Sequence, residues 1–210
     1  MIFFYVDMCS KLVFVIYKDR IAGVQSTQQS GIREPKYMTS MIYKGEIIMF
    51  QGIKKLFGSK KEKEQILAPV AGQAVPLSEV PDPAFAQEIL GKGVAIQPAE
   101  NEFRAPASGE VTVLFETGHA VSIRTESGAD VIVHIGLDTV NLKGQFFTTH
   151  VKQGDTVKAG DLLITADIEQ IKAAGYDVIT PVIVCNVSDF PDMACHPGKT
   201  VKAMDEIITL

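Results

Sequence analysis

Two histidines, His119 and His134, are the residues of this chain best suited to chemistry, because each stands in a short run with the pattern of a β-strand. The polar, glycine-containing stretch between the runs, residues 125–130, is typical of a tight turn. A two-residue turn at 126–127 or at 127–128 makes the histidines direct or diagonal cross-strand neighbours. Both registers place the rings on one face of the sheet. We therefore expect two imidazoles to meet on an otherwise apolar surface.

The surroundings of His134 favour a nucleophilic imidazole. The ring stands in the apolar run Val-Ile-Val-His-Ile-Gly-Leu at residues 131–137, and burial lowers the pKa of a histidine. A neutral ring carries one N–H and one nitrogen with a free lone pair, which makes it a nucleophile near neutral pH. Gly136, two residues further along, lets a ligand or another backbone segment approach closely.

His119 and Thr117 supply the remaining elements of a phosphoryl-accepting site. A second imidazole can donate a hydrogen bond to an oxygen of the group that His134 attacks. Thr117 lies on the same side of its strand as His119, and its hydroxyl can fix the tautomer of one ring. Phosphoryl transfer depends mainly on positioning and electrostatic stabilisation. On the residues alone, the alternative of two hydrogen-bonded core histidines stays open.

The composition indicates a globular protein with an acidic body. The chain has 210 residues, 46% of them apolar, which is enough for one sizeable domain and an appendage. The net charge is −5. Because residues 1–48 carry six basic and four acidic side chains, residues 49–210 account for a charge of −7. This balance argues against nucleic acid as a partner and favours basic protein surfaces. The cysteines, Cys9, Cys185 and Cys195, show no CxxC spacing, so we expect a reducing, cytoplasmic compartment.

From residue 66 onward the sequence predicts an all-β fold, an antiparallel β-sandwich with short helical segments. Short apolar runs alternate with breakers rich in proline, glycine and aspartate, as in a sandwich or barrel. Helical segments are predicted at 84–90, with Asp82 as the N-cap, and at 168–174. The predicted strands are Gly72–Pro76, Gly93–Gln97, Gly109–Phe115, Ala120–Arg124, Asp130–Ile135, Phe146–His150, Leu162–Ala166 and Pro181–Val187.

Two glycine–aspartate pairs, at 154–155 and 160–161, are similar to the turns of lipoyl-type barrels and of the duplicated hybrid motif seen in several β-sandwich families. A lipoyl or biotin carrier is disfavoured, because no lysine stands in a Met-Lys-Met setting.

The N-terminal part has a different character from the rest of the chain. The codons for residues 44–46 can spell a purine-rich tract of the type that precedes bacterial start codons. We therefore expect Met49 to be the translation start, with residues 1–48 as leader sequence; the alternative is a disordered extension. Residues 49–65 are predicted to be a flexible or amphipathic tail. Within it, residues 49–64 place lysines around an apolar stripe, which fits weak contact with an anionic membrane surface or a frayed terminus.

Motifs in an ordered series run from about residue 66 to the C-terminus. Those around the histidines read Glu-Thr-Gly-His-Ala at 116–120 and Val-His-Ile-Gly-Leu-Asp-Thr-Val at 133–140. Further motifs include Ala-Pro-Val-Ala-Gly at 68–72, Gly-Val-Ala-Ile-Gln-Pro at 93–98 and Thr-Pro-Val at 180–182. Residues 66–210 thereby resemble the glucose-class enzyme IIA (EIIA) component of the bacterial phosphoenolpyruvate-dependent sugar phosphotransferase system. The fold that this resemblance implies is a compact antiparallel β-sandwich.

The resemblance also implies a function, that of a phosphotransferase component which carries a phosphoryl group on a histidine. His134 matches the histidine that accepts the group from the phosphocarrier protein HPr and passes it to a cysteine of the EIIB domain of a membrane sugar permease. His119 matches the second histidine, which stabilises the phosphoryl group without being phosphorylated, and Thr117 matches the assisting threonine. The permease selects the sugar, so the sequence leaves the sugar open.

Partners in that family dock on a shallow apolar ring around the histidines, with an acidic contribution. Exposed apolar surface inside a polar rim is typical of a transient interface. For each apolar residue taken singly, ordinary core packing is the alternative. The matching positions are Asp82, Phe85, Ile89, Leu90, Phe115, Val121, Gly136 and Asp138.

Two other functions stay open at this point. Some zinc hydrolases share a related sandwich, but a catalytic zinc normally needs three protein ligands, and no third ligand is evident beside the two histidines. The resemblance implies no required cofactor, although it permits a zinc ion bridged by His119, His134 and a partner's carboxylate. The second alternative is a regulatory module that binds other transporters and enzymes.

Overall fold

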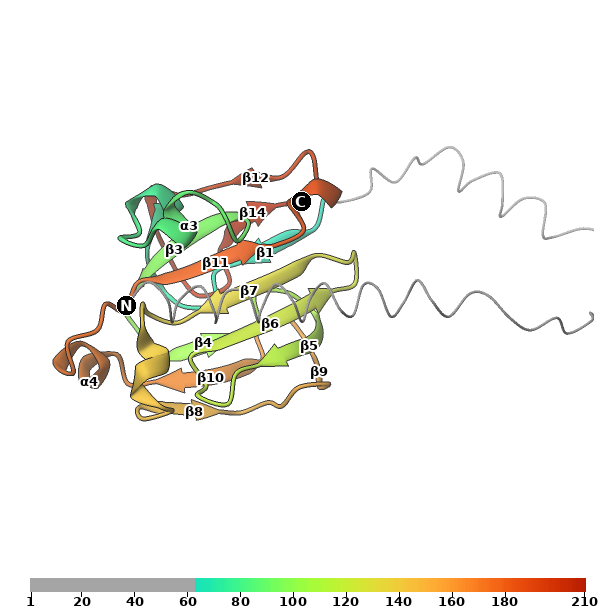
Figure 1. The fold of residues 1–210 in the computed structure, drawn as a ribbon. Coiled ribbons are helices and arrows are strands. Elements are labelled where there is room, and N and C mark those ends of the chain that lie inside the picture. The colour runs from blue at the N-terminus through green and yellow to red at the C-terminus, as the bar shows by residue number, and fades with distance from the viewer. Residues whose placement is uncertain (1–62) are drawn as a thin grey trace, which may run out of the picture. The chain divides into compact units, whose positions relative to one another are not determined.

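The computed structural model describes residues 63–210 (Figure 1). The predicted segment 1–48 and residues 49–62 of the predicted tail lie outside the described residues. None of the helices in residues 63–210 has the length and hydropathy that a membrane span requires.

The described residues form three antiparallel sheets, which confirms the predicted all-β sandwich. The large sheet has eight strands in the order β13-β2-β3-β11-β7-β6-β5-β9. Its strands β3, β11, β7, β6 and β5 lie side by side in Figure 1. Two three-stranded sheets have the orders β1-β14-β12 and β4-β10-β8. The strands are β1 (Gln65–Leu67), β2 (Gly72–Pro76), β3 (Lys92–Pro98), β4 (Glu102–Arg104), β5 (Gly109–Leu114), β6 (Ala120–Thr125), β7 (Asp130–His134), β8 (Phe147–Thr149), β9 (Thr156–Val157), β10 (Leu162–Ala166), β11 (Thr180–Val184), β12 (Ala194–Cys195), β13 (Lys199–Val201) and β14 (Glu206–Thr209).

Helices are short and lie in the connections between strands. The α-helices are α3 (Pro83–Ala86) and α4 (Ile168–Ala173), and the 3-10 helices are η2 (Leu77–Glu79), η3 (Thr139–Leu142) and η4 (Val187–Asp189). The predicted cap of α3 is present, because the Asp82 carboxylate accepts a hydrogen bond from the Ala84 N–H at 2.7 Å. The helix is shorter than the predicted 84–90 because Glu88 adopts a left-handed backbone at φ +55°.

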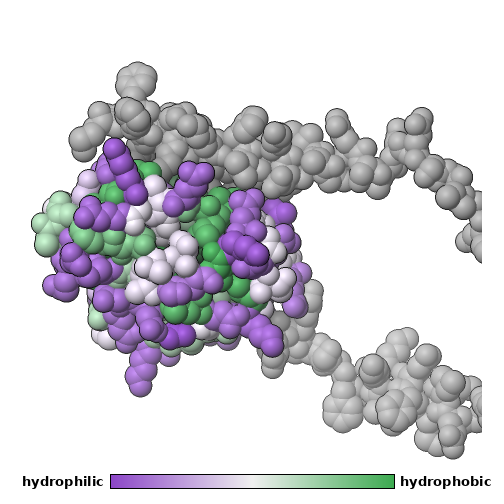
Figure 2. Space-filling view, turned by 90° about the horizontal axis from the view of Figure 1, so that it is seen from below, coloured by the Kyte–Doolittle hydropathy of each residue, from purple (hydrophilic) through white to green (hydrophobic). Residues whose placement is uncertain are grey.

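One hydrophobic core joins all three sheets. It contains Ile66 of β1, Phe103 of β4, Leu163 of β10 and Ile207 of β14, together with inward-facing residues of the large sheet. In β6 and β7 those inward residues are Val121, Ile123, Val131 and Val133. Because side chains alternate along a strand, Ala120, Ser122, Ile132 and His134 occupy the opposite face of the large sheet. The face seen from the β8 side of Figure 1 carries hydrophobic surface between hydrophilic side chains (Figure 2).

The connection between β6 and β7 differs from both predicted turns. Arg124 pairs with Asp130, and Ala120 pairs with His134. The Thr125 N–H donates to the Ala129 carbonyl, and the Gly128 N–H donates to the Thr125 carbonyl. The register therefore falls between the two registers that the two-residue turns require, and the expected pairing of His119 with His134 along the strands is wrong.

Three turns repeat one hydrogen-bond pattern. In each turn an aspartate carboxylate accepts a hydrogen bond of 2.8 to 3.0 Å from the backbone N–H three residues earlier. The residue before the aspartate is left-handed each time: Gly154 at φ +90°, Gly160 at +92° and Met204 at +75°. The sequence indicated only the two turns that contain glycine, because methionine gives no turn signal. The turns are Lys152–Asp155, Lys158–Asp161 and Lys202–Asp205.

Candidate functional site

The two histidines meet at the open end of the β6–β7 hairpin. Their ring centroids lie 5.0 Å apart, and the ring planes are inclined by 83°. His134 is the last residue of β7, whereas His119 immediately precedes β6 and follows Gly118, whose φ is +67°. The alternation rule for strands does not fix the His119 ring, because the residue lies outside the regular strand. Its ring can therefore face that of His134 although the cross-strand partner of His134 is Ala120 and not His119.

Hydrogen bonds at the Nδ1 atoms orient both rings. His134 Nδ1 lies 2.8 Å from the Gly136 carbonyl oxygen. A carbonyl oxygen only accepts, so Nδ1 carries the proton and Nε2 of a neutral His134 ring carries the lone pair. His119 Nδ1 lies 2.5 Å from Thr117 Oγ1. A hydroxyl that donates here leaves the His119 proton on Nε2.

Among the buried side-chain nitrogen and oxygen atoms of residues 63–210, the two Nε2 atoms are the exceptions to polar satisfaction. Both are buried, and neither has a hydrogen-bond partner among residues 63–210. Most buried polar side-chain atoms in proteins have at least one partner, so an unpartnered atom requires an explanation. Two such atoms, on rings in edge-to-face contact, indicate a binding place for a group that residues 63–210 do not themselves provide.

Burial keeps both rings neutral. His119 is 0% exposed and His134 is 5% exposed. Burial, and then the neighbouring His134, lowers the pKa of His119 from 6.5 to about 3. Burial also lowers the pKa of His134, against the opposing effects of the Gly136 hydrogen bond and of Asp82 and Asp138. Near neutral pH the site therefore presents a nucleophilic nitrogen.

The loop after His134 is fixed by close backbone contacts. A Cβ atom on Gly136, whose φ is +74°, would lie 2.6 Å from the Asp177 carbonyl oxygen and 2.6 Å from Thr139 Cγ2. The Leu137 N–H donates to the same Asp177 carbonyl at 2.9 Å. The buried Thr139 hydroxyl donates to the Ile135 carbonyl at 2.6 Å. These contacts hold the Gly136 carbonyl that orients His134. Neither Thr139 nor Asp177 carries a sequence signal that predicts this supporting role.

Two phenylalanines flank the histidine pair. The Phe85 ring centroid lies 5.3 Å from that of His134, and the Phe115 centroid lies 5.1 Å from that of His119. Phe85 is only 2% exposed, so it forms a wall of the site and offers little surface to a partner. Phe115 is half-buried.

The predicted docking positions divide into buried and accessible residues. Val121 is 1% exposed and belongs to the main core, so its prediction as a docking residue is wrong; its side chain points to the inward face of the sheet. Gly136 is also buried, and its carbonyl orients His134. Ile89 is 67% exposed, and Leu90 is half-buried. The half-buried carboxylates Asp82 and Asp138 act electrostatically on His134.

Residues 63–210 do not supply a complete set of metal ligands. No group of three or more histidine, cysteine or acidic side chains in this part of the chain is arranged to hold a metal ion. The two unpartnered Nε2 atoms fit as nitrogen ligands, but they supply only two of the four positions of a tetrahedral zinc site. A bridged zinc ion therefore requires further ligands from outside residues 63–210.

Comparison with known proteins gives matches over most of the described residues. Residues 64–190 match the family model of the phosphoenolpyruvate-dependent sugar phosphotransferase system, EIIA 1. The glucose-specific EIIA component of Oceanobacillus iheyensis is 45% identical over 141 residues, which cover 67% of this chain and 86% of the relative. The β-glucoside-specific EIIBCA component of Bacillus subtilis is 52% identical over 128 residues, which cover 61% of this chain. The chain spans about a fifth of the length of this EIIBCA relative, 21%.

A solved structure shows the same fold. The glucose permease IIA from Mycoplasma capricolum superposes with a TM-score of 0.65 at 37% sequence identity. The match covers 70% of this chain and 96% of the permease chain.

Proposed function

Because the chain belongs to the EIIA 1 family of the phosphoenolpyruvate-dependent sugar phosphotransferase system, we propose that His134 carries a phosphoryl group from phosphorylated HPr to a cysteine of an EIIB domain. The observation that carries this proposal is the state of His134. Its Nδ1 is engaged by the Gly136 carbonyl, and its Nε2 is unpartnered beside the unpartnered Nε2 of His119. The names of the EIIBCA relatives, which join the B, C and A components, support an EIIB domain as the acceptor.

The transfer to His134 exchanges one phosphorus–nitrogen bond for another. The lone pair of His134 Nε2 forms a bond to phosphorus while the bond from phosphorus to the donor's histidine breaks, and the donor ring leaves with the electron pair. Nδ1 keeps its proton because it donates to Gly136. The phosphorylated ring therefore gains positive character, which the negative charges of Asp82 and Asp138 stabilise.

His119 contributes electrostatic stabilisation. When the Thr117 hydroxyl donates to His119 Nδ1, the His119 Nε2–H is available to donate to a phosphoryl oxygen. Its low pKa keeps His119 neutral, so the ring acts as a hydrogen-bond donor with one proton. We assign acceptance to His134, stabilisation to His119 and orientation to Thr117.

The partners dock on the surface beside the pair in this proposal. The exposed Ile89 and the half-buried Leu90 and Phe115 offer apolar surface, and Asp82 and Asp138 offer negative charge to basic partner residues. A cytoplasmic location follows from the proposed exchange with HPr.

The experiment incubates the full chain with phosphorylated HPr and measures the intact mass and the modified residue. We expect one added phosphoryl group on His134. The His134→Ala variant should gain none, whereas His150→Ala, which removes an exposed histidine bonded to Thr165, should behave as the unmodified protein. Phosphorylation of His134→Ala to the normal extent would contradict the proposal.

A second variant separates the roles of the two rings. His119→Gln should still accept a phosphoryl group from HPr but should pass it slowly to the EIIB cysteine. The reason is that the variant lacks the His119 Nε2–H, which donates to a phosphoryl oxygen in this proposal. A complete block of acceptance in His119→Gln, with the fold intact by circular dichroism, would contradict this division.

A further inference from the structure

We propose that Gly118 is a positioning residue for His119, an inference that rests on the proposed function. Gly118 places the second imidazole by adopting a left-handed backbone between Thr117 and His119, and so sets the rate at which the phosphoryl group leaves His134 for its acceptor.

The first support is the backbone of the loop that carries His119. Gly118 has φ +67°, a region in which most L-residues are strained. Its N–H donates to the Phe115 carbonyl at 2.8 Å, and the Phe115 N–H donates to the Ala120 carbonyl at 3.1 Å. The loop is thus closed at both ends around the glycine. A change of φ at Gly118 would rotate the Thr117 hydroxyl and the His119 ring relative to each other.

The second support is the wall behind the glycine. Gly118 is buried, and a Cβ atom there would lie 3.1 Å from Phe147 Cβ and 3.2 Å from Thr149 Cγ2. Both residues belong to β8, which pairs with β10 through Phe147–Ala166 and Thr149–Ile164. A displaced loop therefore meets a paired strand, which limits the directions in which it can relax.

The third support is that the same wall is tied to the loop of His134. The segment from Asp138 to Phe147 begins with a carboxylate that acts electrostatically on His134 and ends with Phe147, which lies against Gly118. Asp138, Lys143 and Phe146 all have left-handed backbones, with φ of +58°, +52° and +73°. Strained residues of this kind persist where the surroundings determine them strongly, and they cluster at functional sites. The Phe146 carbonyl accepts the Asp167 N–H at 2.9 Å, which fixes the end of the segment. One segment thus relates the positions of both imidazoles.

The test compares two glycines, Gly118 and Gly128, that both have left-handed backbone conformations. Gly128 has φ +90°, but a Cβ atom there would have nothing within 4 Å, and the residue lies at the turn end of the hairpin. Gly128→Ala therefore reproduces the left-handed penalty without touching the histidine loop. Gly118→Asn tests the backbone strain by itself, because asparagine tolerates the left-handed region better than alanine does while its Cβ atom meets the same atoms of β8.

The readouts are the unfolding midpoint, the rate of acceptance from phosphorylated HPr, and kcat and KM for transfer to the EIIB domain. We expect both alanine variants to lower the unfolding midpoint. Gly118→Ala alone should reduce kcat for onward transfer, by about tenfold to a hundredfold, with little change in KM. Gly118→Asn should recover only the part of the lost kcat that backbone strain causes, because its Cβ atom meets β8 as that of alanine does. The NMR signals of the His119 ring should shift in Gly118→Ala and should stay unchanged in Gly128→Ala.

Two outcomes would overturn the proposal. One is a Gly118→Ala protein that is as destabilised as Gly128→Ala and has an unchanged onward kcat, which would make the glycine merely structural. The other is a Gly118→Ala protein that is slow in onward transfer although the NMR signals of its His119 ring are unchanged. If Gly118→Ala does not fold, Thr149→Ser in the same chain removes the 3.2 Å contact, and the double variant carries the test. Failure of the unmodified protein to accept a phosphoryl group would instead refute the proposed function.

Discussion

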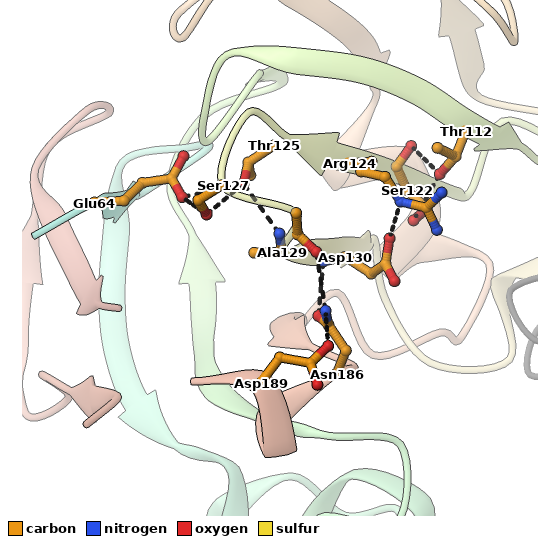
Figure 3. Close-up of polar contacts among 11 residues, drawn as sticks. Glu64, Thr112, Ser122, Arg124, Thr125, Ser127, Ala129, Asp130, Asn186 and Asp189 are labelled. Atoms are coloured by element: carbon orange, nitrogen blue, oxygen red, sulfur yellow. Dashed lines mark hydrogen bonds and ion pairs between the residues drawn. The ribbon is translucent and has the colours of Figure 1, made fainter. Parts of the chain in front are cut away.

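The two ends of the β6–β7 hairpin differ in whether their buried polar groups have hydrogen-bond partners. At the turn end, the nearly buried Asp130 bonds Arg124 Nε at 2.8 Å, and its N–H donates to the Asn186 side chain at 2.9 Å (Figure 3). The Asn186 amide also donates to the Gly128 carbonyl and to Asp189. At the open end, the Nε2 atoms of the two histidines are buried with no partner in the described part of the chain.

The difference shows how one pair of strands separates stability from reactivity. A satisfied polar network fixes the turn, and a hydrogen bond from Thr125 to the Glu64 carboxylate joins it to the start of the described chain (Figure 3). The open end keeps two unsatisfied nitrogens, which lower stability and provide binding capacity. We therefore expect substitutions at the turn end to change stability and those at the open end to change transfer.

The largest expected effects come from two substitutions, one at each end of the hairpin, which should change different properties of the protein. His134→Leu should abolish phosphoryl acceptance and change the free energy of unfolding by only about 1 kcal/mol, because it removes an unsatisfied atom along with one hydrogen bond. Asp130→Ala should lower the free energy of unfolding by about 2 kcal/mol and leave acceptance unchanged. The second value is below that of a fully buried ion pair, since the Arg124 side chain is 39% exposed. Urea unfolding and the HPr assay measure both quantities; equal losses of transfer in the two variants would break the comparison.

A smaller effect concerns pH. The His119 pKa is 6.5 ordinarily and about 3 in the folded protein, so between these values the unfolded chain binds more protons. The free energy of unfolding is therefore unaffected by this titration above pH 6.5, and it declines as the pH falls below that value. The slope is about 1.4 kcal/mol per pH unit for each such histidine, and the His134 pKa is lowered in the same direction.

Urea unfolding of the unmodified protein and of His119→Gln from about pH 7.5 to about pH 5 checks this slope. The variant should lose stability less steeply, by close to one proton. Carboxylates titrate equally in both proteins, so their contribution cancels in the difference. Parallel curves would mean that His119 is not held neutral by burial.

The smallest expected effect lies away from both ends of the hairpin. Met204→Gly should raise the free energy of unfolding by about 0.5 kcal/mol, because glycine tolerates φ +75° but also loses more entropy on folding. Phosphoryl acceptance should not change. Gly154→Ala in the corresponding turn should act in the opposite sense, since its φ is +90°.

The sequence predicted the sandwich, most strands of the large sheet and the meeting of the two histidines. It could not predict the hairpin register, because the number of residues in the turn depends on backbone hydrogen bonds at Thr125 and Ala129. The rings meet nevertheless, since His119 lies beyond the regular strand. The sequence also could not separate Val121 from the accessible candidates for docking, such as Ile89. Both faces of β6 are covered, so Val121 and Ser122, which point to opposite faces, are each only 1% exposed.

The most direct measurement of the central claim identifies the nitrogen that bears phosphorus. The 15N-labelled chain is phosphorylated with HPr, and 15N and 31P NMR assign the phosphohistidine isomer and the residue. Because Nδ1 of His134 donates to the Gly136 carbonyl, we predict phosphorus on His134 Nε2, with His119 unmodified. Phosphorus on His134 Nδ1, or on His119, would contradict the account.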